Sequence, residues 1–174
     1  MEHLKVNQNK INFLWKVITR FDHYINSTNT KASLVIAWNG IVIGTVLVKY
    51  EIIIKAFSEN QCDQLIVAIG LGILCISSLI SIFFVFGVVT PSIPKNKNQK
   101  NLIYFGSVST MDQQQYHSLL SESNDSSIIT DLTLQATELA TILEKKMEKT
   151  KISILFMCIG LFIIYLMLAY KIII

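Results

Sequence analysis

The chain has 174 residues, of which 52% are apolar and 16% are charged, and its net charge is +3. An ordinary soluble domain of this length is less apolar and more charged, so the composition excludes that class and indicates a membrane protein. The positive charge gives little support for nucleic-acid binding, because the lysines cluster beside apolar segments.

The first 31 residues are predicted to form a cytoplasmic amphipathic helix. Apolar residues recur there every three or four positions, the period of one helical face: Ile11, Leu14, Val17, Ile18, Phe21, Tyr24 and Ile25. No proline or glycine separates this stripe from the apolar segment 32–54, so we predict one continuous helix. The charged start also lacks the pattern of a signal peptide, so 32–54 should stay as the first transmembrane span.

The first span contains polar and small residues that suggest helix packing. Asn39 is costly to expose to lipid and should find a partner on another helix. Gly40 and Gly44 form a G-x-x-x-G pair, which favours either a contact between copies or packing against the chain's own second or third span. Serines of the second span should likewise serve packing, unless several copies turn them inward with Asn39 to form a polar path: Ser77, Ser78 and Ser81.

Two further spans are predicted from their lack of charge. Residues 65–90 and 152–170 carry no charged side chain and are long enough, at about 1.5 Å per residue, to cross about 30 Å of hydrocarbon. A short external loop, 55–64, should join the first two spans, and the third should extend over 152–174.

The segment 91–151 is predicted to be a cytoplasmic sensor region with an amphipathic helix. Pro91 and Pro94 end the second span and begin a basic lead-out. The run Leu102–Phe105 is unusually apolar for a connecting loop, and we expect it to plug a seam between helices. Thr110 with Gln113 fits a capping box for a short helix over 111–121.

A second stripe at helical spacing continues without a break through Lys151 into the last span: Ile128, Ile129, Leu132, Ala136, Leu139, Ile142, Leu143 and Met147. Both amphipathic helices run towards the membrane, so they can pack side by side in parallel. Equal distances from the membrane place Arg20 near Glu138 and Glu144, which predicts an ion pair.

Basic residues set the expected orientation. Of the 15 lysines and arginines, five lie in residues 1–31 and seven in 91–151. Under the positive-inside rule, both segments and the N-terminus are then cytoplasmic.

The sequence gives no support for an enzyme, a metal site or a cofactor. The three histidines adjoin no nucleophile motif, no glycine-rich loop follows a strand, and the three cysteines have no ligand spacing. One alternative to the plug remains open for "LIYFG": Tyr104 or Phe105 stacks on a nucleobase while a basic residue meets a phosphate, namely Lys95, Lys97 or Lys100.

Three stretches in one order resemble the small transmembrane effectors of bacterial Pycsar anti-phage defence, the PycTM family. They are "FDHYINSTNTKASLVIAWNG", "LIYFGSVSTMDQQQYHSLL" and "DLTLQATELATILEKKMEKTKIS". Lys31 is a further candidate ligand-binding residue. The chain departs from the family pattern at Asn29, where the family has Asp, so Lys31 loses an acidic neighbour two residues away.

The resemblance implies that a pyrimidine nucleotide cyclase makes cyclic CMP or cyclic UMP, and that this effector senses it and compromises the inner membrane. We therefore expect an all-α membrane protein with three transmembrane helices, long cytoplasmic helical extensions and a small helical sensor. It should be a homo-oligomer in the lipid bilayer, because three spans are too few to enclose a pore. The alternative function is a non-enzymatic adaptor whose cytoplasmic helices bind a protein partner.

Overall fold

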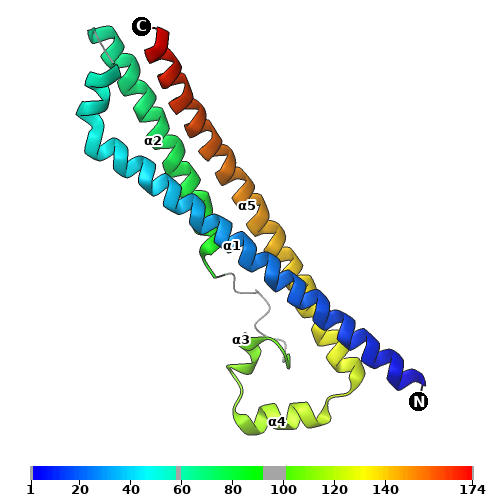
Figure 1. The fold of residues 1–174 in the computed structure, drawn as a ribbon. Helices are drawn as coiled ribbons and strands as arrows, with labels where there is room; N and C mark the ends of the chain where they lie inside the picture. The colour runs from blue at the N-terminus through cyan, green and yellow to red at the C-terminus, as the bar shows by residue number, and fades with distance from the viewer. Residues whose placement is uncertain (1, 58–59, 92–100, 174) are drawn as a thin grey trace. The chain divides into compact units, whose positions relative to one another are not determined.

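A computed structural model of the protein describes residues 2–57, 60–91 and 101–173. Five helices follow one another in the described chain, α1 (Glu2–Phe57), α2 (Gln61–Val89), α3 (Phe105–Val108), α4 (Gln113–Glu122) and α5 (Asp125–Ile173) (Figure 1). The structure is 92% helical with no strand among the described residues, which confirms the predicted class. Three helices, α1, α2 and α5, are long and apolar enough to cross a membrane.

The chain divides into two compact units. The first contains Met1–Asn26 and Pro91–Lys145, and the second contains Ser27–Thr90 and Lys146–Ile174. Helices α1 and α5 each contribute residues to both units, because neither helix is interrupted. This confirms that each amphipathic stripe continues without a break into an apolar span.

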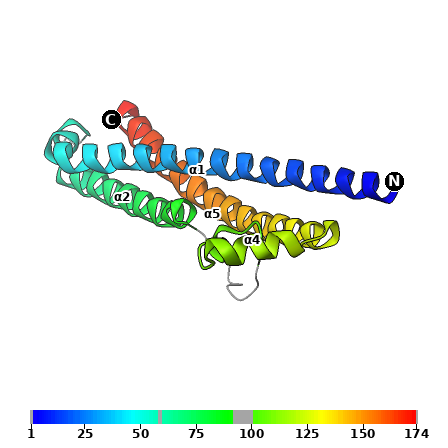
Figure 2. The same ribbon diagram turned by 90° about the horizontal axis from the view of Figure 1, so that it is seen from below.

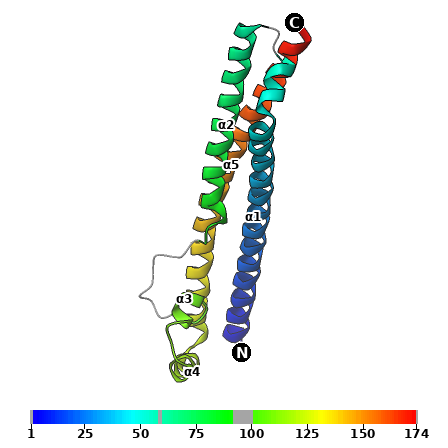
Figure 3. The same cartoon turned by 90° about the vertical axis from the view of Figure 1, so that its left-hand side faces the viewer.

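The core of the first unit lies between α1 and α5, which run side by side there in the same direction (Figures 2 and 3). Its buried centre combines both predicted stripes: Ile11, Ile18, Leu132 and Ala136. Residues around this centre are partly buried: Leu14, Val17, Phe21, Ile103, Ile128, Ile129 and Leu139. The predicted burial of the two stripes against each other is therefore confirmed.

The predicted ion pair of Arg20 is wrong. Its Nε donates to the Tyr24 hydroxyl at 3.1 Å, and its guanidinium carbon lies 5.5 Å from the centre of that ring. No ion pair links Arg20 to Glu138 or Glu144, all of which are described residues. A partner four residues along the same helix is always within reach, so the guanidinium uses it instead.

The second unit is a bundle of α1, α2 and α5 with two apolar layers. One is centred on Ala32, Val35, Val85 and Val88, and the other on Val46, Val67, Leu71 and Leu74. A Cβ added at Gly160 would lie 3.2 Å from a methyl carbon of Leu74, so the glycine allows α5 to approach α2 closely.

Two boundaries differ from the sequence prediction. The expected external loop 55–64 is largely helical, because α1 reaches Phe57 and α2 begins at Gln61. The short helix α4 begins after Asp112, not after Thr110. Asp112 Oδ1 accepts a hydrogen bond from Gln115 N at 2.7 Å, whereas the Thr110 hydroxyl donates to Ser107 O at 2.8 Å. A carboxylate is the stronger cap for the positive end of a helix.

Candidate functional site

The loop 101–104, the start of the apolar run, is docked on both α4 and α5. Leu102 N donates to Asp131 Oδ2 on α5 at 2.9 Å, and the Tyr116 hydroxyl on α4 donates to Leu102 O at 3.2 Å. The loop holds its own shape through Asn101, whose Oδ1 accepts from Ile103 N at 2.8 Å and from Tyr104 N at 3.0 Å. This side chain is 3% exposed, so the turn is part of the interior of the first unit.

The apolar side chains of the loop are covered, as the plug interpretation predicts. Leu102 is 9% exposed and Tyr104 is 6% exposed, while Ile103 packs against the core between α1 and α5. A Cβ added at Gly106 would lie 2.5 Å from a Tyr104 ring carbon, so only glycine leaves room for the ring. The ring is thus packed within the protein and presents no open face to a ligand in this conformation.

The described structure does not bring the other predicted ligand residues together with Tyr104. Phe105 begins α3, but its side chain lies outside the described part of the structure, as do Lys95, Lys97 and Lys100. Lys31 is exposed and belongs to the second unit, whereas Tyr104 belongs to the first.

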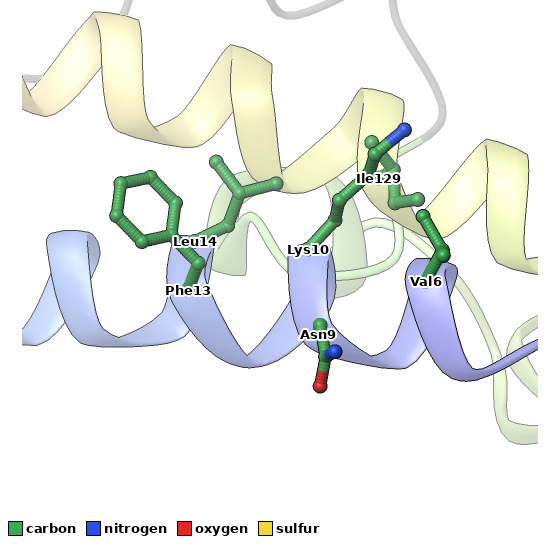
Figure 4. A pocket seen from close by; sticks show the side chains of 6 residues that line it. All are labelled: Val6, Asn9, Lys10, Phe13, Leu14 and Ile129. Atoms are coloured by element: carbon green, nitrogen blue, oxygen red, sulfur yellow. The ribbon is translucent and has the colours of Figure 1, made fainter.

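The first unit has two hollows near these elements. One, of about 250 Å³, lies beside the docked loop and is lined by Leu102, Leu119, Glu122, Ser123, Ser127 and Asp131. The other, of about 430 Å³, lies between α1 and α5 and is lined by Val6, Asn9, Lys10, Phe13, Leu14 and Ile129. Figure 4 shows Lys10 and Leu14 reaching towards α5 and Asn9 pointing away from it. The first hollow is rich in hydrogen-bond acceptors, and the second combines an aromatic ring with one cation.

Lys146 forms a buried polar contact among the three long helices of the second unit. Lys146 is 5% exposed. Its Nζ donates to Asn29 Oδ1 on α1 at 3.1 Å and to Val88 O near the end of α2. Burial lowers the pKa of Lys146, and the nearby charge of Lys149 lowers it further. Asn29 is a neutral partner of Lys146, because its side chain is an amide.

A second polar contact lies deeper in the bundle and again uses one residue from each helix. Asn39 Nδ2 of α1 donates to Ser81 Oγ of α2 at 3.1 Å. Ser81 Oγ donates to Ser153 O of α5 at 2.9 Å, and Ser153 Oγ donates to Ser81 O at 2.8 Å. The three side chains are 0–1% exposed, so Asn39 has the interhelical partner that the sequence required.

A third polar contact closes the far end of the bundle. The Tyr170 hydroxyl of α5 donates to Asp63 Oδ1 of α2 at 2.7 Å, and Lys171 Nζ lies 4.9 Å from the centre of the Phe57 ring on α1. Three polar tiers thus alternate with the two apolar layers along the second unit.

Gly40 and Gly44 take no part in this packing. A Cβ added at either glycine would have no described atom within 4 Å, and both residues are exposed. In the described structure these glycines therefore do not pack against the chain's own second or third span. A contact between copies remains the prediction for this pair.

Sequence reasoning missed the roles of Lys146, Asn29 and Ser153. Lys146 follows Leu139 and Leu143 at the same three-and-four spacing, so its place on the buried face could have been read from the stripe. Its charge hid that signal, because a lysine beside a membrane is usually assigned to the interface.

A family model described as the Pycsar effector protein domain matches residues 13–173. The chain belongs to the Pycsar effector family. Membership makes it an anti-phage defence effector, in a family of effectors and not of a known enzyme class, and implies a response to a cyclic nucleotide made by a cyclase. No curated protein and no solved structure matches the chain.

Proposed function

We propose that this Pycsar effector senses a cyclic pyrimidine nucleotide, cyclic CMP or cyclic UMP, and in response impairs the inner membrane of the infected cell. The observation that carries the proposal is the continuity of α1 and α5. Each helix forms part of the core beneath the docked loop and, without interruption, part of the bundle that can span a membrane.

This continuity offers a physical route from ligand to membrane. A ligand shifts an equilibrium only through its different affinity for two conformations. Ile103 of the loop packs against the core that α1 and α5 share, so a ligand that displaces the loop changes the packing of both helices. A change in the crossing of these helices then acts on the spans that continue from them.

The loop and its basic neighbours are the proposed ligand contacts. The base would stack on Tyr104 or Phe105 once the loop has moved, and the phosphate would meet lysines of the lead-out: Lys95, Lys97 and Lys100. Lys31 of α1 is a separate candidate ligand residue in the second unit. The burial of Tyr104 supports a sensor that must open, because a ligand that uses its ring has to break the resting packing.

We further propose that the protein lies in the bacterial inner membrane as a homo-oligomer with its N-terminus in the cytoplasm. The outward position of Gly40 and Gly44 supports a contact between copies, since small residues let helices in lipid approach closely. The distribution of basic residues supports the orientation.

The test begins with the Tm of the detergent-solubilised protein against a panel of cyclic mono- and oligonucleotides. Stabilisation by one cyclic pyrimidine nucleotide, growing with its concentration as linkage requires, is the expected result. The same ligand should then release dye from liposomes that contain the protein. Absence of any shift in folded protein would favour the adaptor, and a shift without leakage would refute the membrane activity alone.

Tyr104→Ala and Phe105→Ala test the proposed stacking. Each variant should remain folded by circular dichroism and lose most of the ligand-induced rise in Tm. Leu120→Ala is the matched control, because this exposed apolar residue of α4 lies outside the docked loop. An unchanged ligand response in both loop variants would refute stacking on these rings.

A further inference from the structure

The amide oxygen of Gln135 is an unsatisfied hydrogen-bond acceptor. It is buried, and no described residue donates to it, which is true of no other buried side-chain nitrogen or oxygen in the described chain. A buried acceptor without a donor loses its hydrogen bonds to water and gains none in return. Such a group in a folded protein calls for a specific explanation.

Gln135 lies on α5 beside the residues that hold the loop 101–104. It follows Asp131, whose carboxylate accepts from Leu102 N, by four residues, so the two side chains share one side of the helix. Ser127 and Asp131, two and one turns earlier on this side, line the hollow of about 250 Å³. The next residue, Ala136, belongs to the core against which Ile103 packs.

Few polar contacts hold the Leu102 end of the loop. The described structure gives Leu102 one backbone bond to Asp131 and one to the Tyr116 hydroxyl, the latter at 3.2 Å. A ligand that offers donors and acceptors of its own can exchange with these two bonds. The loop can therefore be displaced from α5 without breaking a helix.

We propose that Gln135 is a binding residue of the sensor, and that its amide reads the hydrogen-bonding edge of a nucleobase which enters beside the displaced loop. This rests on the proposed function. The amide oxygen accepts from an N–H of the base, and the amide nitrogen donates to the neighbouring acceptor of the base. Cytosine and uracil both place a donor beside an acceptor on this edge, and a side-chain amide matches such a pair.

The unsatisfied oxygen gives this residue a role in switching as well as in affinity. In the resting state its missing hydrogen bond raises the free energy of the resting conformation. Ligand binding supplies the missing donor, so the bound state gains a hydrogen bond that the resting state lacks. The difference between the two states is what allows a ligand to shift their populations.

Gln135→Met tests the inference because it keeps the length of the side chain and removes its polar atoms. Two results are expected together: the Tm of the ligand-free protein rises, and the apparent affinity for cyclic CMP or cyclic UMP falls at least tenfold. Gln114→Met, a substitution of the same kind at an exposed position of α4, should change neither quantity. Gln135→Leu, measured in parallel, guards against an effect peculiar to methionine.

The other outcomes separate this inference from the proposed function. If wild type responds and both Gln135 variants respond equally well, the oxygen has another role, such as holding a buried water, and the inference is wrong. A lower Tm in both variants would show that the amide is satisfied in the resting protein, which also overturns it. If wild type responds to neither nucleotide, the proposed sensing fails together with the inference.

Discussion

The most direct test of the bundle is Ser81→Ala, because Ser81 joins the three long helices. The substitution keeps the size of the side chain nearly unchanged and removes two interhelical hydrogen bonds, those with Asn39 Nδ2 and with Ser153 O. The two serine hydroxyls also lie 2.9 Å apart, but each has one proton and donates it to a backbone oxygen, so this contact is not counted as a third bond. Ser153 Oγ keeps its bond to the backbone oxygen of residue 81, and Asn39 Nδ2 keeps its bond of 2.8 Å to Val35 O. Two hydrogen bonds are therefore lost, and Asn39 and Ser153 each keep one.

Interhelical hydrogen bonds in membrane proteins contribute about 0.6 kcal/mol each on average and at most about 1.7. Loss of two should lower the free energy of unfolding by about 1 kcal/mol, with an upper limit of about 3. The assay is unfolding in mixed micelles with increasing SDS, followed by circular dichroism. Ser77→Ala is the matched control: this serine is also buried on α2 but donates only to Leu74 O of its own helix.

The reasoning is refuted if Ser81→Ala and Ser77→Ala shift the unfolding curve equally. Equal effects would mean that the volume of the hydroxyl matters and its interhelical bonds do not. An effect of Ser81→Ala well above about 3 kcal/mol would also contradict the calculation, since two bonds cannot supply it.

Three other predictions concern separate features. Burial lowers the pKa of Lys146 from 10.5, so the unfolded chain binds the proton more tightly than the folded chain does. The stability of wild type relative to Lys146→Met should therefore rise as the pH approaches 10.5. A difference in Tm between the two proteins that stays constant with pH would contradict this. Gly106→Ala should displace the Tyr104 ring, destabilise the protein by about 1–3 kcal/mol and increase proteolysis near the loop, whereas unchanged cleavage would show that the ring has room. Leucine at Gly40 and Gly44 should leave the Tm nearly unchanged but reduce cross-linking between copies in liposomes, and undiminished cross-linking would exclude this face as the contact.

The long helices could be predicted because their signals are repeated many times. The stripe around Ile11 and Ile18 continues over several turns, and no proline or glycine interrupts it before Gly40. The partner stripe around Leu132 also continues over several turns and also runs towards an apolar span. Where many residues agree on one period, the packing that buries them follows from geometry.

Single contacts could not be predicted in the same way. The sequence predicted Thr110 as the helix cap, whereas Asp112 caps α4 in the structure. The two candidates differ only by a hydroxyl and a carboxylate two residues apart. The sequence of α5 does not show that the Gln135 amide oxygen is buried without a donor, because that depends on which parts of the fold surround it. Such facts depend on tertiary contacts that no periodic pattern encodes.

The polar tiers of the second unit limit how its helices can move. Val88 and Ser81 on α2 meet Lys146 and Ser153 on α5, seven residues apart on each helix. Sliding α5 along α2 by one residue, about 1.5 Å, would misalign both pairs at once. The nearest other register that sets a residue of one tier opposite a residue of the other lies seven residues, about 10.5 Å, away. Sliding one helix along another therefore breaks the polar contacts of several tiers at the same time. Tilting a helix can instead separate the tiers one after another. If the three helices separate, the separation should therefore begin at one end of the bundle. The polar contacts around Ser81 should break only after those of one of the two outer tiers.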